Sequence, residues 1–160
     1  MNKDVIGALK TAWENKQPVD DFVHRKMMDV FRLYLIVGGM PQAVNAYKEN
    51  NNLQDVMAQQ QEIIRLYRKD ISQYDEVRRL SIKEVFDLIP SELNSKNKRF
   101  IIKNLNEKAR MEKYRDEFLW LKNAGVAIPT YNVEEPKLPL KLASSRNLFK
   151  LFSNDVGLLE

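Results

Sequence analysis

The chain has 160 residues, a formal net charge of +4 from 26 basic and 22 acidic residues, one His and no Cys. Without Cys there is no disulfide and no thiolate metal site, and a single His argues against a His metal cluster or a Ser-His-Asp hydrolase. No apolar run approaches the roughly 18 residues that span a membrane. We therefore expect a cytoplasmic globular protein of one ordinary domain or two small ones, with no metal site and no membrane partner.

The N-terminal part of the chain predicts two helices. Apolar residues at helical spacing run from Lys3 to Asn15 and stop before a Gln-Pro pair, which predicts a short helix. Asp20 or Asp21 can cap a longer helix that ends at Val37. The last turn of this second helix is apolar nearly all round, so we expect it to be deeply buried.

A sharp corner and two more helices are predicted next. Gly38-Gly39 can adopt the left-handed conformation that ends a helix, and Pro41 suits the first turn of the following one. That third helix is short and gives way to a polar run. From Leu53 to Tyr74 the apolar residues keep a helical period over about six turns, which predicts a long fourth helix.

Two further helices with a short element between them are predicted in the middle of the chain. Ser81 and Glu84 have the spacing of a capping box, and Pro90 predicts a break or kink in the helix that they start. The apolar run at 100–102 is too short to assign to a helix or a strand. A helical stripe over 111–121, closed by an Ala-Gly pair, predicts the second of these helices.

The C-terminal part of the chain predicts strands. β-forming residues at 126–133 and an alternating pattern at 138–142 predict strands on either side of a loop, and residues 148–152 predict a third. The expected fold class is therefore mainly α with a small β wing. A helical, lid-like bundle over residues 1–75 precedes a winged-helix module, a helix-turn-helix plus β-hairpin, over residues 76–160.

The strongest charge signal lies at residues 95–122, which hold nine basic and four acidic residues. Their net charge of +5 exceeds that of the whole chain, so the remaining residues sum to −1. A basic segment that leads into the second helix of a helix-turn-helix suits salt-sensitive contacts with phosphates. The candidate nucleic-acid-binding residues are Lys96, Lys98, Arg99, Lys108, Arg110 and Lys113.

The helix that follows this basic segment weakens the case for DNA. On a helical wheel Glu112, Asp116 and Trp120 point roughly outward, and the two carboxylates would repel phosphates from the middle of that face. Three interpretations therefore stay open: binding of duplex DNA, use of the winged helix for contacts between domains or protomers of a homo-oligomer, and a merely solvated basic face.

Four stretches of the chain carry a family resemblance. They are the Gly-Gly-Met-Pro corner within 33–44, the helix end at 67–71, the segment at 86–93 and the run at 149–159. In this order they resemble a large bacterial and archaeal family of AAA-type ATP-binding proteins. The likeness covers the region that follows the ATPase core in that family.

The resemblance implies that the sequence is a piece of a longer protein. In that family a P-loop ATPase core precedes this region and a domain similar to restriction endonucleases follows it, so these two domains are the expected partners and ATP and Mg²⁺ belong to the parent protein. A P-loop needs two glycines five positions apart, and none of the five glycines here has that spacing. We expect a non-catalytic, cofactor-free fragment that couples the ATPase core to the winged helix, or alternatively a winged-helix DNA-binding module.

Four other residues or short motifs match part of a known catalytic or nuclease site, and each also has a simpler structural interpretation. His24 is favoured as a structural or solvated residue, because no partner for acid-base catalysis is evident. Residues 95–98 match Ser-x-x-Lys, but in a polar turn. Residues 135–137 match the Glu-x-Lys of a nuclease, but in a loop without a strand-borne acid. Asp155 could belong to a nuclease-like domain, yet alone it coordinates nothing. No catalytic residue is assigned.

Overall fold

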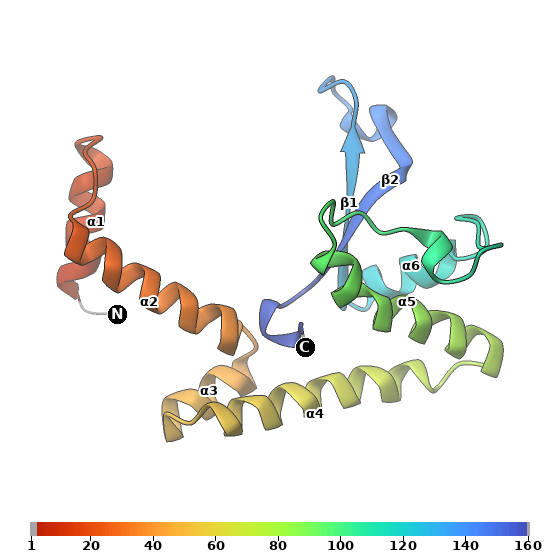
Figure 1. The fold of residues 1–160 in the computed structure, drawn as a ribbon, viewed down its shortest axis with the longest axis horizontal. Coiled ribbons are helices and arrows are strands. Elements are labelled where there is room, and N and C mark those ends of the chain that lie inside the picture. Colours follow the sequence, from red (N-terminus) through yellow and green to blue (C-terminus); the bar gives the residue numbers. More distant parts are fainter. Residues whose placement is uncertain (1–2, 160) are drawn as a thin grey trace.

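The computed structural model describes residues 3–159, and within them it holds six α-helices and one two-stranded antiparallel sheet (Figure 1). The predicted fold class, mainly α with a small β wing, is confirmed. The helices are α1 (Lys3–Glu14), α2 (Asp21–Val37), α3 (Pro41–Asn50), α4 (Leu53–Ile71), α5 (Glu76–Asn94) and α6 (Arg115–Asn123), and the strands are β1 (Ala127–Val133) and β2 (Ser144–Ser153). Three short 3₁₀ turns are η1 (Ile102–Asn104), η2 (Leu140–Ala143) and η3 (Val156–Leu158).

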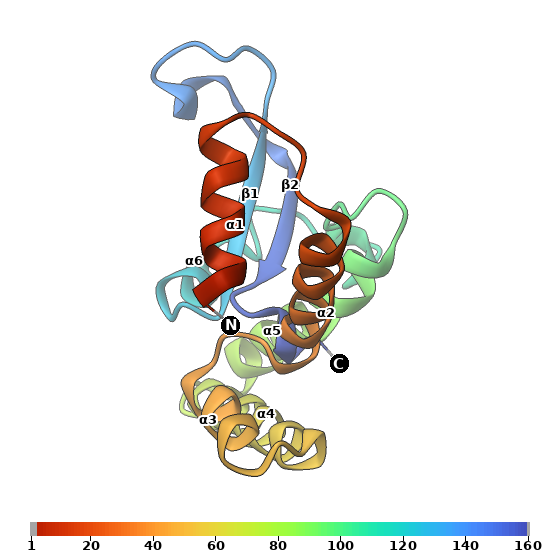
Figure 2. The ribbon, with the colours of Figure 1, turned by 90° about the vertical axis from the view of Figure 1, so that its left-hand side faces the viewer.

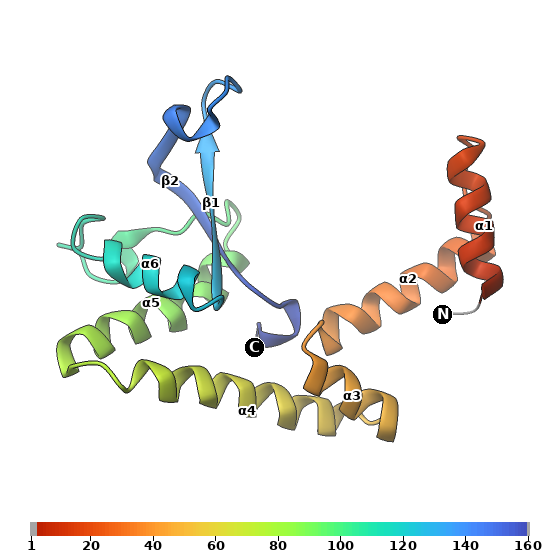
Figure 3. The same cartoon turned by 180° about the vertical axis from the view of Figure 1, so that it is seen from behind.

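Helices α1 and α2 form an arm, residues 3–37, that reaches away from the rest of the molecule (Figures 1 and 3). Asp20 caps α2 as predicted, because its carboxylate accepts hydrogen bonds from two backbone amides of the first turn. The prediction that the last turn of α2 is deeply buried is wrong. Val37 is buried there, but Tyr34 and Ile36 are 48% and 49% exposed. The turn has the apolar composition of a buried helix, yet the described chain covers it only in part.

The corner between α2 and α3 forms as the glycines and the proline predict. Gly38 ends α2 with a φ of 72°, and Pro41 is the first residue of α3. Asn52 then caps α4 by accepting a hydrogen bond from the Gln54 amide. Helix α4 ends at Ile71, so the predicted long helix is present, and its last predicted apolar position, Tyr74, lies in the turn that leads to α5.

Helix α5 begins earlier than the predicted capping box. Asp75 is its N-cap and accepts a hydrogen bond from the Arg78 amide at 3.1 Å. Ser81 therefore lies inside the helix, where its hydroxyl donates to the Val77 carbonyl. Of the break or kink predicted at Pro90, the break is absent, since α5 continues to Asn94. Proline lacks the N–H of a helical hydrogen bond, but the apolar side of α5 is buried in the main core and holds the helix together.

The second half of the chain holds α5, α6 and a two-stranded hairpin, the order of elements that we expected for a winged-helix module, and we use that name for this part of the chain. Helix α6 begins at Arg115, because residues 111–114 form turns instead of the predicted first helical turn. Strands β1 and β2 pair in a hairpin with Tyr131 opposite Phe149. The strand predicted at 138–142 is wrong: η2 occupies most of it, within the hairpin connection, where two prolines remove ladder hydrogen-bond donors.

The main hydrophobic core lies between α5, α6 and the hairpin. Three aromatic rings, of Phe100, Phe118 and Phe149, stack and meet edge to face with centroids 5.2–5.7 Å apart. The Phe100 amide donates to the Phe149 carbonyl at 3.0 Å, which explains the apolar run that was too short to assign. Figure 2 shows the hairpin rising on one side of α5 and the α3–α4 pair lying on the other. The core therefore fixes the wing onto the helices of the module.

Candidate functional site

The chain turns back after strand β2 and meets the corner between α2 and α3. Asp155 lies at this turn with 9% of its surface exposed. Its carboxylate accepts hydrogen bonds from the amide of Gly39 at 2.6 Å and from the amide of Gly157 at 2.8 Å. A single buried carboxylate thus ties the end of the hairpin to a helix corner that lies far away in the sequence.

Glycine is required on both sides of this contact. Gly38 has a positive φ, and a Cβ at this position would overlap Oδ1 of Asp155. A Cβ on Gly157 would lie 2.9 Å from the Cα of Gly38 and 2.7 Å from the side-chain nitrogen of Gln60. The two backbone segments therefore approach each other more closely than any larger residue allows.

Gln60 of α4 completes the junction. Its side-chain amide is buried and donates to the carbonyls of Ile36 at 2.8 Å and Val37 at 3.3 Å. These carbonyls belong to the last turn of α2, where the helix itself offers them no partner. The arm is thus held at its base by α4 and by the end of the hairpin. We call the five residues that do this the clasp: Gly38, Gly39, Gln60, Asp155 and Gly157.

Further contacts surround the clasp. The Asn154 side-chain amide donates to the Tyr67 hydroxyl at 3.3 Å, and the ring of Tyr67 packs edge to face on Phe86. Arg68 and Asp87 form an exposed ion pair at 3.1 Å. All four stretches that carry the family resemblance therefore meet in one junction, a convergence that the sequence alone could not show.

A cavity of about 300 Å³ opens at this junction. Its lining is mostly apolar and includes Leu158 of η3 together with the Arg68–Asp87 pair. Within residues 3–159, no group of three or more His, Asp or Glu residues is placed to hold a metal ion. The chemistry of the clasp is hydrogen bonding between segments of the chain.

The six residues predicted to bind nucleic acid all lie exposed in the segment between α5 and α6. The contacts of Lys98 and Lys113 within the chain are the following. Lys98 has a positive φ, and its ammonium group donates to the Leu93 carbonyl at 3.0 Å, near the end of α5. The ammonium group of Lys113 lies 5.8 Å from the ring centroid of Tyr114. These two cations are thus partly engaged in holding local structure.

Two others of the predicted set, Arg99 and Arg110, line a common cavity of about 340 Å³. Lys103 also lines it, although the sequence analysis did not select this residue. Lys103 could have been selected from the sequence, because it lies in the same basic segment. Lys96, Lys98, Lys108 and Lys113 do not line this cavity.

Glu92 is a structurally important residue that the sequence analysis missed. It is 5% exposed, and its carboxylate accepts hydrogen bonds from the Ile101 amide at 2.8 Å and the Asn104 side-chain amide at 2.6 Å. Its position three residues after the buried Ile89 was the available signal, since that spacing puts a carboxylate on the buried side of α5. Glu92 holds the segment around η1 against α5.

The exposed surface of α6 carries charges of both signs. Asp116 is exposed, as is Glu112 in the turn before the helix, which agrees with the helical wheel. Arg115 and Lys122 of α6 are exposed as well, and Leu119 is 51% exposed. Trp120 differs from the prediction because it is half-buried, with its ring edge to face on Tyr74 at 5.7 Å. Helix α6 therefore offers a surface of mixed charge with an exposed apolar residue, rather than a uniformly basic one.

Tyr114 marks the buried side of α6. Burial raises the pKa of its hydroxyl, and the carboxylates of Glu84 and Glu117 raise it further. Glu117 is itself 8% exposed, and one of its carboxylate oxygens has no hydrogen-bond partner. The neutral form of Tyr114 is therefore favoured in the folded chain.

The other candidate groups lie in ordinary surroundings. His24 is exposed on the first turn of α2. The Ser95 hydroxyl donates to the Glu92 carbonyl at 2.6 Å, so it ends α5 rather than activating a lysine. Glu135 and Lys137 pair with each other at 2.8 Å in the exposed hairpin connection.

A family model described as a domain of unknown function matches residues 28–160. No curated protein matches the chain, and no solved structure does. Among residues 3–159, none of the helices has the length and apolar character that crossing a membrane requires.

Proposed function

The chain belongs to the DUF8612 family, and we propose that it is a non-catalytic module that couples the ATP-binding core of an AAA-type ATPase to the winged helix. The partner and its ATP and Mg²⁺ are those that the sequence resemblance implies. The observation that carries the proposal is the set of large apolar side chains exposed along the arm. They are Ile6, Trp13, Phe22, Val30, Phe31, Tyr34, Leu35 and Ile36.

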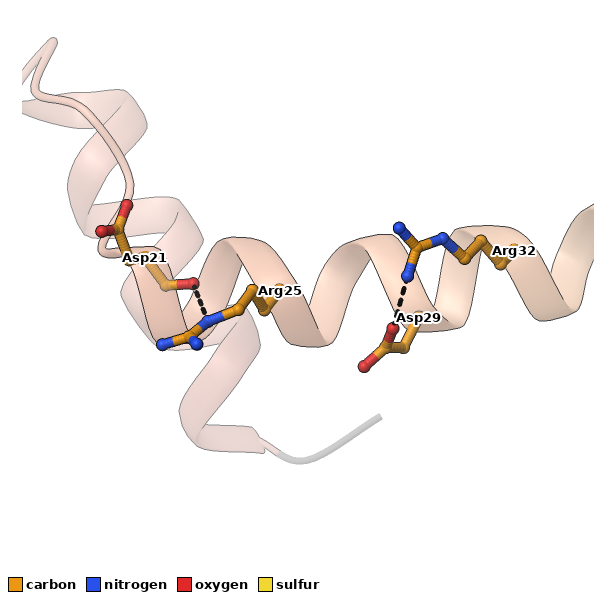
Figure 4. A network of polar contacts seen from close by, with 4 residues as sticks. All are labelled: Asp21, Arg25, Asp29 and Arg32. Carbon is orange, nitrogen blue, oxygen red and sulfur yellow. Dashed lines mark hydrogen bonds and ion pairs between the residues drawn. The ribbon is translucent and has the colours of Figure 1, made fainter.

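The distribution of charge on α2 supports a docking role. The side chains of Arg25 and Arg32 fold back along the helix toward Asp21 and Asp29, as Figure 4 shows, with Arg32 and Asp29 paired at 3.0 Å. At about 100° per residue these four residues share one side of α2, and Val30 lies near the opposite side. An amphipathic helix of this kind is normally covered on its apolar side. In the described chain that side is covered only in part, and Val30 and Tyr34 on it are 46% and 48% exposed.

The clasp supports the coupling part of the proposal. It binds the last turn of α2 to α4 through Gln60 and to the end of β2 through Asp155. A displacement of the arm by the ATP-binding core would therefore be transmitted to the hairpin through hydrogen bonds between rigid elements. The mechanism proposed is mechanical, and it uses no catalytic group of this chain.

Trp13 offers a direct test because it is 86% exposed on α1. With Trp120→Phe in the background, Trp13 is the one remaining tryptophan. The full chain is titrated with a purified AAA-type core of the family that it resembles, with ATP and then with ADP. Docking of the arm should shift the Trp13 emission to shorter wavelength and protect it from an aqueous quencher.

Matched variants locate the docking surface. Phe31→Ser and Tyr34→Ser should weaken binding of the core about tenfold each, since each removes an apolar anchor from the interface. Asp29→Ser on the charged side should bind normally. Equal effects on both sides, or no binding to the core at all, would contradict the proposal.

A second candidate function is nucleic-acid binding by the winged-helix module. The observation that favours it is the cavity lined by Arg99, Lys103 and Arg110. Binding of duplex DNA should be detectable at about 50 mM salt and should weaken steeply as salt rises. Undetectable binding at this salt concentration would exclude this function.

A further inference from the structure

We propose that the cavity between residues 99–103 and 109–112 is a phosphate-binding site. This inference rests on the second candidate function and is independent of coupling to an ATPase. The cavity has a volume of about 340 Å³, which lies within the usual range of ligand pockets. Its walls come from the two ends of the segment that joins α5 to α6.

The charges around the cavity favour an anion. Arg99, Lys103 and Arg110 line it together with one acidic residue, Glu112, which leaves a net lining charge of +2. Guanidinium groups can donate two parallel hydrogen bonds to phosphate oxygens, and an ammonium group adds a mobile point charge. Lys108 and Lys113 are exposed on the same segment and extend the positive surface beyond the cavity.

The walls of the cavity are held in place by hydrogen bonds. Glu92 fixes one wall through the Ile101 amide and the Asn104 side chain. On the other side, Asn106 accepts hydrogen bonds from the amides of Lys108 at 2.9 Å and Ala109 at 2.8 Å. A ligand would therefore meet a site that needs little ordering before it binds.

The location of the site differs from that expected of a helix that reads a DNA groove. Exposed charges of both signs alternate on α6 and on the hairpin connection, where Lys137 pairs with Glu135. Three basic residues and one acidic residue line the cavity before α6. The phosphate contact is therefore assigned to the segment before α6 rather than to α6 or the wing. The ligand is a phosphate group, carried either by a polynucleotide or by a small free polyphosphate.

Binding measurements on the full chain test this assignment. The anisotropy of a short fluorescein-labelled DNA, single-stranded or duplex, is followed at about 50 mM salt and over rising salt. The double variant Lys103→Gln/Arg110→Gln should weaken binding about tenfold or more and lower the salt slope by about 2. The control double variant, Lys48→Gln/Lys69→Gln, removes the same charge from exposed residues of α3 and α4 and should change affinity less than about twofold.

Calorimetry with inorganic tripolyphosphate distinguishes the source of the phosphate. If tripolyphosphate binds in a way that depends on Lys103 and Arg110 while DNA does not bind, the phosphate site is supported and nucleic-acid binding is excluded. If DNA binds but the cavity and control variants weaken it equally, nucleic-acid binding stands and the phosphate site is wrong. If neither ligand binds, both are wrong. Unchanged melting temperatures of the variants show that the exposed substitutions leave the fold intact.

Discussion

The arm and the winged-helix module carry the same kind of amphipathic pattern, but they differ in what covers their apolar sides. In the module, Phe100, Phe118 and Phe149 are 2–3% exposed and pack on one another. In the arm, Phe31 belongs to the apolar stripe of α2 as Phe118 does to that of α6, but Phe31 is 49% exposed. Helical periodicity thus identifies the side that a helix prefers to bury, while the cover itself comes from tertiary structure or from another molecule.

The largest expected effect is a difference between these two regions in the cost of losing a phenylalanine. Phe149→Ala should lower the free energy of unfolding by about 3–5 kcal/mol, because it empties the centre of the module's core. Phe31→Ala should lower it by less than about 1 kcal/mol, because that ring is half exposed. Urea unfolding of the full chain measures both. Equal losses would mean that the arm is packed as tightly as the module.

The clasp joins the two regions, and Asp155→Ala should weaken it. The substitution leaves the amides of Gly39 and Gly157 without their acceptor, which costs about 1–3 kcal/mol. Hydrogen exchange of the Gly39 amide should quicken, and the free energy of unfolding should fall. Asp87→Ala removes an exposed ion pair instead and should stay within about 1 kcal/mol of the parent chain. An Asp155→Ala chain as stable as the Asp87→Ala chain would contradict the role given to the carboxylate.

A smaller effect distinguishes the two possible starts of α5, the first helix of the module. Asp75→Ala removes the observed N-cap and should destabilise the chain by about 1 kcal/mol. Ser81→Ala changes a residue inside the helix and should alter stability by less than about 0.5 kcal/mol. Thermal unfolding followed by circular dichroism compares them. A larger loss of stability in Ser81→Ala than in Asp75→Ala would show that the helix starts at the capping box that the sequence predicted.

The smallest effect is confined to alkaline pH. The pKa of Tyr114 is raised in the folded chain, so folding favours the neutral hydroxyl. This contribution to the free energy of unfolding is fully present below the pKa of an unfolded tyrosine, about 10. It is lost as the pH rises from there through the pKa of the folded chain. Tyr114→Phe should match the parent chain at neutral pH and lose less stability above about pH 10. Identical alkaline profiles of the two chains would show that Tyr114 does not titrate differently in the fold.

Helix caps and corners were predicted correctly in both the module and the arm where they depend only on neighbouring residues. The cap at Asp20 and the corner at Gly38 depend on a few neighbouring residues, and both formed as expected. The start of α5 and the strand at 138–142 were wrong because a competing cap and two prolines outweighed the apolar pattern. The exposure of the last turn of α2 depends on the whole fold and could not be inferred from composition.

The candidate sites were predictable to different degrees. The basic segment is a local property, so its six residues could be selected, but only the fold brings Arg99, Lys103 and Arg110 around one cavity. The clasp could not be found from spacing at all. Its glycines and Asp155 looked like unrelated parts of a family resemblance until the structure placed them in contact.

The hydrogen bond between Asp155 and Gly39 joins residues 116 positions apart. Closing so long a loop carries a large entropic cost, so contacts of this kind form late in folding. The order of synthesis acts in the same direction, because the arm leaves the ribosome long before Asp155 does. For that interval the angle of the arm is not yet set by the clasp, and a partner synthesised nearby can engage its apolar side before the last contact closes.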